Sequence, residues 1–343
     1  MHLPLPDANE PLGLATEAQL RQRLLNRFGD RIETIGRSEA GRPLLGWVMG
    51  SGPRKMSLVA GAHADEPVGS MTLGYLTERL MDEPESEVLS GCTLCVVLHA
   101  NPDGAAANEP WVKQWPDPMA CLKHVVREPP GRDVEFGYPD LRPENRAVSA
   151  FFEKHGPFDL HASLHGMTLS EGGLLLIEST WADRTGDLRR RYAGDLAKAG
   201  LALFDHDRGG EKGFEYLGPG FSTTPRGEAM RVHFQKQGDP ATAELFRDSS
   251  MEWVRSLGGD PLALVTELPL FVIRGRPEPQ RPGVPVQYLK LRAMLPDLRR
   301  KVDRGEDVRA ELEPFGLEPL PVETAVRLQL LALQRGLEAV GGA

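Results

Sequence analysis

The chain has 343 residues, 40% of them hydrophobic and 26% charged, with a formal net charge of −9. This composition indicates a globular protein of one large domain or two ordinary ones, and its acidity argues against nucleic acid or an anionic membrane surface as the main partner. No apolar stretch approaches the roughly 20 residues of a membrane-spanning helix. The first residues lack the features of a signal peptide, and three cysteines cannot form a disulfide framework, so we expect a cytoplasmic protein.

Hydrophobic periodicity predicts alternating helices and strands over most of the chain. In chain order, the first expected elements are a helix over 15–28, strands over 32–35, 44–49 and 56–61, a helix over 68–81 and a strand over 92–98. The next are a helix over 142–154, strands over 158–165 and 174–178, helices over 187–199 and 239–257, and a strand over 262–268. Residues 105–140 and 209–227 contain many glycines or prolines and no clear periodicity, so we expect loops there.

The end of the sequence has a different character. A segment rich in proline and arginine, 275–283, is expected to link a catalytic domain of residues 1–274 to a C-terminal helical extension of residues 284–343. We expect two amphipathic helices in this extension, over 285–304 and 323–340. Pro296 should kink or split the first of them. Their apolar faces favour packing on the same domain over an interface with another chain.

Strands that alternate with helices predict an α/β fold with a mixed, largely parallel central sheet flanked by helices. In such sheets, functional sites form at the carboxyl ends of the strands. Polar residues at the ends of the predicted strands are therefore the first candidates for chemistry.

His63 and Glu66 lie between a buried strand and a helix. An imidazole nitrogen and a carboxylate oxygen are good zinc ligands, and a turn at a strand end can direct both to one point. Two ligands do not hold a zinc ion, and His165, at the end of a later strand, can supply a third. His161 would share the face of His165, but it is more typical of a core histidine or a hydrogen-bond partner.

Three further residues have both a structural and a chemical interpretation. Glu267 lies in an apolar strand, where a carboxylate is costly unless it is paired, for example with Arg274 or Arg276, or acts as a general base beside a metal. In the long loop, Asp133 could orient a ligating imidazole, and Arg127 could stabilise the oxyanion formed when water adds to a carbonyl. Taken alone, these two would be an ordinary loop aspartate and a surface arginine.

Together the motifs resemble the carboxypeptidase A-like family of zinc metallopeptidases, which is related to the succinylglutamate desuccinylases and aspartoacylases. The order and spacing of short segments carry this resemblance over most of the chain. In order, they are Ile35-Gly36-Arg37-Ser38 with Gly41-Arg42-Pro43, Gly61-Ala62-His63-Ala64-Asp65-Glu66-Pro67, Asn101-Pro102-Asp103-Gly104, Arg142-Pro143-Glu144-Asn145-Arg146-Ala147, Ser163-Leu164-His165, Ser249-Ser250-Met251-Glu252-Trp253 and Thr266-Glu267-Leu268.

The resemblance implies a Zn²⁺ cofactor and its three protein ligands, His63, Glu66 and His165. It also implies that Glu267 is the general base and carries the proton to the leaving group. Arg127 would polarise the scissile carbonyl, and Asp133 would support His63.

The chain departs from the family pattern where the terminal carboxylate of a substrate would be held. An Asn-Arg pair is usual there, but this sequence has Glu135-Phe136, and a glutamate would repel a carboxylate. The mobile tyrosine of the family also has no counterpart shortly before Ser249. We expect Arg132, Glu135 and Phe136 to lie at the substrate site, with Arg132 or Arg226 as a substitute clamp.

Three functions follow, in order of preference. The first is a zinc-dependent hydrolase of an amide or peptide bond, of carboxypeptidase type, with non-standard recognition of the terminal carboxylate. The second is a deacylase of small N-acyl amino acids. The third is a zinc-binding module that does not catalyse a reaction. The expected partner is a peptide or small amide substrate, with no role for nucleic acid or a membrane.

Overall fold

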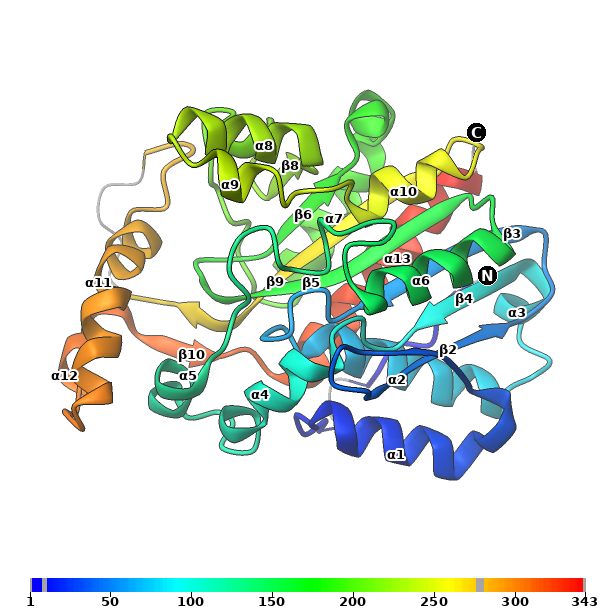
Figure 1. The fold of residues 1–343 in the computed structure, drawn as a ribbon, viewed down its shortest axis with the longest axis horizontal. Coiled ribbons are helices and arrows are strands. Elements are labelled where there is room, and N and C mark those ends of the chain that lie inside the picture. Colours follow the sequence, from blue (N-terminus) through cyan, green and yellow to red (C-terminus); the bar gives the residue numbers. More distant parts are fainter. Residues whose placement is uncertain (1, 8–10, 276–280, 342–343) are drawn as a thin grey trace.

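The computed structural model describes residues 2–7, 11–275 and 281–341 (Figure 1). Its described strands form one mixed sheet in the order β1-β2-β4-β3-β5-β9-β6-β8-β7, with β10 paired to β9. The strands are β1 (Glu33–Arg37), β2 (Pro43–Met49), β3 (Arg54–Ala60), β4 (Cys92–Val97), β5 (Leu160–Ser170), β6 (Leu174–Ile177), β7 (Tyr216–Gly218), β8 (Phe221–Thr223), β9 (Leu262–Ile273) and β10 (Leu317–Pro319).

Four neighbouring strands, β4, β3, β5 and β9, run parallel, and antiparallel pairs flank them on both sides. This arrangement confirms the predicted mixed sheet with a parallel centre. The central strands are covered on both faces, as their continuous apolar sequences indicated. Leu58 and Val59 of β3 point to opposite faces and are both fully buried, each in a separate hydrophobic core.

Helices cover both faces of the sheet (Figure 1). On one face α2 packs on β3 and β5, α13 packs on α2 and α7, and α1 packs on α2. On the other face α6 packs on β1, β2 and β4, and α10 packs on β5. The helices are α1 (Glu17–Phe28), α2 (Val68–Asp82), α3 (Glu87–Gly91), α4 (Pro102–Val112), α5 (Pro118–His124), α6 (Pro143–His155), α7 (Gly186–Lys198), α8 (Gly227–Lys236), α9 (Pro240–Ala243), α10 (Ser250–Ser256), α11 (Val286–Asp303), α12 (Arg309–Leu312) and α13 (Val322–Gly341).

The long loop predicted over 105–140 was partly wrong, because α4 and α5 lie within or overlap it. The side chain of Asn101 caps α4 by accepting a hydrogen bond from Gly104 N at 2.9 Å. Pro102 occupies the first turn, where a missing N–H removes no helical hydrogen bond. The Asn-Pro pair was thus a helix start, although its composition is typical of a turn.

The single helix predicted over 239–257 was also wrong, because α9 and α10 are separate. Ser249 starts α10 with a capping box, in which its hydroxyl accepts from Glu252 N and the Glu252 carboxylate accepts from Ser249 N. Helix α8 was not predicted. Pro296 lies inside α11 and does not split it.

The C-terminal segment contributes to the same sheet and core. Strand β10 pairs antiparallel with the end of β9, and Leu330, Leu333 and Leu337 of α13 are fully buried. Residues 276–280 of the predicted linker lie outside the described residues. Within the described ranges, no helix combines the length and apolar character that a membrane crossing requires.

Candidate metal centre and active site

The candidate site lies where β3 stops and its neighbours continue. Ala60, the last residue of β3, pairs with Leu164, so His165 is the first residue of β5 beyond the end of that strand. The chain turns away from the sheet at Gly61, whose φ is +69°. A Cβ at this position would lie 2.4 Å from the ring of His99, so both backbone angle and space require glycine here. The turn carries His63 back over the open end of the sheet.

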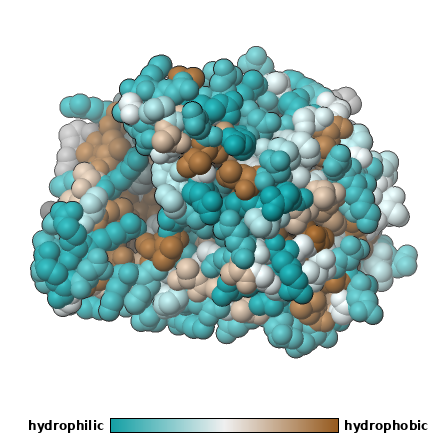
Figure 2. Space-filling model, viewed as in Figure 1, coloured by the Kyte–Doolittle hydropathy of each residue, from teal (hydrophilic) through white to brown (hydrophobic). Residues whose placement is uncertain are grey.

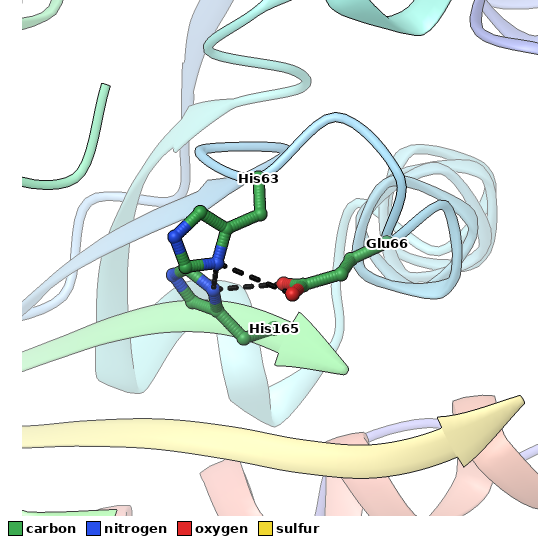
Figure 3. Close-up of side chains that lie close together, drawn as sticks. All are labelled: His63, Glu66 and His165. Atoms are coloured by element: carbon green, nitrogen blue, oxygen red, sulfur yellow. Dashed lines mark hydrogen bonds and ion pairs between the residues drawn. The ribbon is translucent and has the colours of Figure 1, made fainter. Parts of the chain in front are cut away.

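Three donor groups converge at this point (Figure 3). His63 Nδ1 lies 3.2 Å from Glu66 Oε1 and 3.0 Å from His165 Nδ1, and His165 Nδ1 lies 2.9 Å from Glu66 Oε2. Glu66 Oε2 also accepts a hydrogen bond from Gly166 N at 3.2 Å. Residues 102 positions apart in the sequence therefore meet as the resemblance implied.

The donor set fits a zinc ion in both chemistry and spacing. Two imidazole nitrogens and a carboxylate oxygen are typical zinc ligands, with bonds of about 2.0–2.2 Å. Ligands at the corners of a tetrahedron with such bonds lie roughly 3.3 Å apart, close to the separations among His63, Glu66 and His165. His63, Glu66 and His165 would therefore hold a zinc ion, and two of them, His63 and Glu66, also line the cavity described below.

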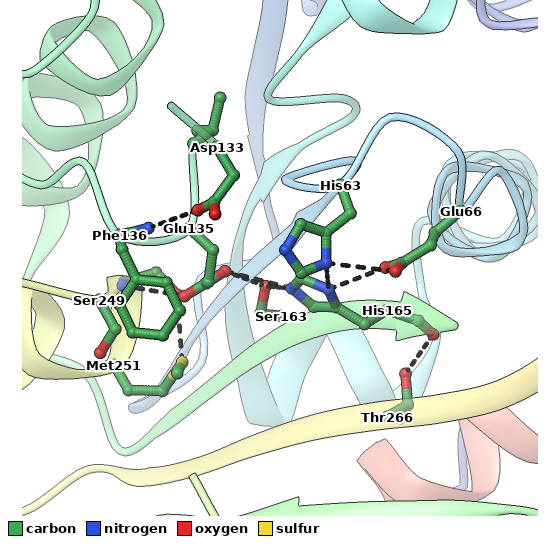
Figure 4. Close-up of polar contacts among 12 residues, drawn as sticks. His63, Glu66, Asp133, Glu135, Phe136, Ser163, His165, Ser249, Met251 and Thr266 are labelled. Carbon is green, nitrogen blue, oxygen red and sulfur yellow. Dashed lines mark hydrogen bonds and ion pairs between the residues drawn. The ribbon is translucent and has the colours of Figure 1, made fainter. Parts of the chain in front are cut away.

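Glu135 holds His165 from behind (Figure 4). Its Oε2 lies 3.1 Å from His165 Nε2 and accepts from Ser163 Oγ at 3.0 Å. Its Oε1 accepts from Ser250 N at 3.0 Å and from Ser250 Oγ at 2.7 Å. The carboxylate is buried and directed away from the surface. Glu135 thus orients the imidazole so that Nδ1 points to the other donors.

His161 lies one layer farther from the donors. Its Nδ1 is 2.9 Å from Ser57 Oγ, and its Nε2 is 3.1 Å from Ser250 Oγ. Burial lowers the pKa of His161 to about 4, so the ring is neutral near pH 7. The residue therefore connects β3, β5 and α10 through the serine that also binds Glu135.

Two carboxylates around one imidazole give the site an excess of negative charge. Burial alone would lower the pKa of His165, but Glu66 and Glu135 raise it well above its ordinary value. Burial likewise opposes ionisation of Glu135, yet its hydrogen bonds and the charge of His165 lower its pKa to about 2. A divalent cation at the donor atoms would neutralise this excess.

Glu267 lies beside the donors on β9, where it pairs in register with His165 of β5. Burial, with a contribution from the charge of Glu66, raises the pKa of Glu267 to about 8. Its Oε2 is buried and has no hydrogen-bond partner. An unpaired carboxylate oxygen of this kind can accept and release a proton near neutral pH.

Arg127 and Asp133 approach the site from the segment between α5 and α6. The guanidinium of Arg127 makes ion pairs with Glu66 Oε1 at 2.6 Å and with Asp65 Oδ1 at 2.8 Å. Asp133 accepts a hydrogen bond from Phe136 N at 3.1 Å, and the charge of His63 partly offsets the rise in its pKa caused by burial. Support of His63 by Asp133 stays a prediction.

A cavity of about 420 Å³ opens over the donors. On the surface, a recess between the regions of α8 and α11 exposes hydrophobic side chains (Figure 2). The lining comes from the turn that carries His63 and Glu66, from the segment between α5 and α6, from β5 and β9, from residues 208–230 and from α11. The lining residues are His63, Glu66, Arg127, Asp133, Phe136, Gly166, Met167, Thr168, Leu169, Arg208, Lys212, Phe214, Pro225, Met230, Glu267, Tyr288, Leu291, Arg292 and Leu295.

The residues expected to bind substrate lie in different places. Phe136 lines the cavity, whereas Glu135 points behind His165. Arg132 forms an exposed ion pair with Glu39, and Arg226 bonds to Ser179 Oγ at 3.2 Å. Neither arginine is among the described residues that line the cavity.

Three cations in the cavity wall had not been identified from the sequence: Arg208, Lys212 and Arg292. Lys212 lies in the loop predicted over 209–227, Arg208 immediately precedes that loop, and Arg292 lies on a predicted amphipathic helix. Their only signal in the sequence was a positive charge, which is ordinary for exposed loops and helices. Only the folded chain brings them to one cavity.

The zinc carboxypeptidase family model matches residues 19–170 of this chain, which include His63, Glu66 and His165. The chain is a zinc carboxypeptidase-like hydrolase. Members of this family are zinc-dependent, and His63, Glu66 and His165 are placed so that they could hold a metal ion. No curated protein matches the sequence.

Solved structures show the same fold for this zinc carboxypeptidase-like chain. Carboxypeptidase A from Helicoverpa armigera superposes with a TM-score of 0.53 at 12% identity, over 96% of this chain and 74% of that one. A candidate metallopeptidase from Shewanella amazonensis SB2B gives a TM-score of 0.51 at 13% identity, over 94% and 91% of the two chains. At such low identity these likenesses concern the fold alone.

Proposed function

We propose that this zinc carboxypeptidase-like hydrolase removes a C-terminal residue from a short peptide, with Glu267 as general base. One observation carries the proposal: Glu267 lines the same cavity as His63 and Glu66, and one of its carboxylate oxygens is buried without a hydrogen-bond partner. A structural glutamate would instead be paired with an arginine or with backbone N–H groups. The family match alone does not assign this residue, because Glu267 lies beyond the matched segment.

The chain's own residues would divide the reaction as follows. A zinc ion held by His63, Glu66 and His165 would supply Lewis acidity. The Glu267 carboxylate would accept a proton from the attacking water and deliver it to the leaving amine. Arg127, fixed by Asp65 and Glu66, donates to the carbonyl oxygen as negative charge develops there.

The decisive experiment compares wild type with Glu267→Gln, which keeps the shape of the side chain and removes its basicity. We expect kcat/KM to fall by about 10²–10⁴, while the zinc content measured by elemental analysis is unchanged. Glu318→Gln, an exposed residue of β10, is the matched control and should retain wild-type activity. Full activity in the Glu267 variant would refute the assigned role.

Two alternatives stay open, and each has its own outcome. The modest size of the cavity and its cover by α11 also suit a small N-acyl amino acid. Faster hydrolysis of N-acyl amino acids than of blocked dipeptides would assign the chain to the deacylases. One bound zinc ion per chain, with no hydrolysis of N-acyl amino acids or of blocked dipeptides, would favour a binding module that does not catalyse a reaction.

A further inference from the structure

The cavity contains an excess of cations for which the proposed reaction has no use. Arg127 is paired with two acids, but Arg208, Lys212 and Arg292 also line the wall. Among the described residues, no acid forms an ion pair with any of these three. Unpaired cations that share one small cavity repel one another, so the arrangement is unfavourable unless an anion binds there.

Repulsion among the three cations contributes to lowered pKa values at two of them, Arg208 and Lys212. Burial lowers the pKa of Arg208; the charges of Glu267 and Tyr288 oppose this shift, and the charge of Arg292 adds to it. The pKa of Lys212 is also lowered, first by burial and then by repulsion from Arg292 and Arg208, while Glu211 opposes the shift. All three groups are therefore close enough to interact.

Local structure holds the cluster in place. The guanidinium carbon of Arg208 lies 3.9 Å from the ring centroid of Phe214, a cation–π contact that supports the side chain. Lys212 has a φ of +56° and a ψ of +20°, and it is the only residue other than glycine with positive φ in the described chain. Such a backbone is uncommon for a lysine and is found where a side chain is directed to a particular place.

The cluster joins two segments that do not supply the metal donors. Arg208 and Lys212 belong to the chain between α7 and β7, and Arg292 lies on α11 of the C-terminal segment. The position of the usual carboxylate clamp is meanwhile occupied by Glu135, whose charge is used by His165. Carboxylate recognition must therefore come from another part of the cavity.

We propose that Arg208, Lys212 and Arg292 form an anion subsite that selects substrates ending in glutamate or aspartate. This inference rests on the proposed function, since it concerns the residue released by the hydrolase. A terminal carboxylate alone would engage one or two cations. Three unpaired cations in one cavity match the two carboxylates of an acidic C-terminal residue.

The test uses the zinc-loaded protein and three blocked dipeptides that differ only in a C-terminal glutamate, glutamine or lysine. We expect wild type to prefer glutamate over glutamine by about 10- to 100-fold in kcat/KM, the range of one or two charge-assisted contacts. Arg208→Gln and Arg292→Gln should bring the two substrates to within about twofold. Arg292→Glu should favour the lysine substrate over the glutamate one.

Arg300→Gln is the matched control, because Arg300 lies on the same helix, is exposed and is not among the described residues that line the cavity. It should keep the preference of the wild type. Equal cleavage of glutamate and glutamine substrates by wild type, or a preference unchanged in both glutamine variants, would overturn the subsite.

A binding measurement separates the subsite from the hydrolase function. Calorimetry with free glutamate and free glutamine should show at least tenfold tighter binding of glutamate, which Arg292→Gln abolishes. That result without hydrolysis of any amide would support the subsite and refute the proposed function. Hydrolysis with no binding preference between glutamate and glutamine would support the proposed function and refute the subsite.

Discussion

At the scale of single residues, the three metal donors were predictable from the sequence, but the residue that orients His165 was not. His63 and Glu66 are three positions apart beside a buried strand, so sequence spacing alone places them together. The position of His165 on a parallel strand predicts the third donor. Glu135 lies 30 positions from His165 and 115 from Ser250, and nothing in the local sequence indicates that it faces them.

The first prediction concerns the contact between Glu135 and His165. Glu135→Gln keeps the shape of the side chain but removes the charge that orients and polarises His165. We expect zinc affinity, measured by competition with a chelator, to fall by about 10- to 100-fold. An affinity within twofold of wild type would show that the contact between Glu135 and His165 is only structural.

At the scale of elements, strongly periodic segments were predicted well and those with mixed composition were not. The strands β3 and β4 are short apolar runs with no alternative interpretation. Helices α4 and α8 contain glycine, proline or many polar residues, and they are stabilised by caps and tertiary packing that periodicity does not reveal. The amphipathic pattern located α13, but it did not show that one polar residue of this helix points inward.

That residue is Gln329, which is fully buried. Its side-chain N–H groups donate to the His165 carbonyl and to Thr266 Oγ1, both at 3.0 Å. Its Oε1 accepts from Thr72 Oγ1 at 2.5 Å. One side chain of α13 thus joins α2, β5 and β9 directly beneath the metal donors.

We expect Gln329→Leu to lower the free energy of unfolding by about 1–3 kcal/mol, because the polar partners would stay buried without hydrogen bonds. Urea denaturation measures the change. Gln22→Leu, on the exposed face of α1, controls for the substitution itself and should have an effect within about 0.5 kcal/mol. A Gln329 variant as stable as this control would show that the network does not contribute to stability.

At the scale of the whole molecule, buried neutral histidines make stability depend on pH. Burial lowers the pKa of both His99 and His161 to about 4, below the value of about 6.5 expected for an unfolded chain. Between these values the unfolded state binds more protons than the folded one. The contribution of each histidine is therefore fully present above pH 6.5 and is lost as the pH falls towards 4.

His99→Asn isolates one of these contributions, since an amide oxygen can still accept the hydrogen bond that Asn101 N gives to Nδ1. From pH 7 to pH 5, wild type should lose about 2 kcal/mol more stability than this variant. Thermal unfolding at a series of pH values measures the difference. Parallel curves for the two proteins would show that the pKa of His99 is the same in the folded and unfolded states.

The hydrogen bond from Gln329 to the His165 carbonyl also has a consequence for biosynthesis. The backbone that presents the third donor is fixed by α13, which the ribosome makes after every other described element. A nascent chain that still lacks this helix holds His63 and Glu66, but its His165 carbonyl lacks the hydrogen bond from Gln329. Zinc capture should consequently follow release of the C-terminal helix from the exit tunnel, which makes metal loading a late step in maturation.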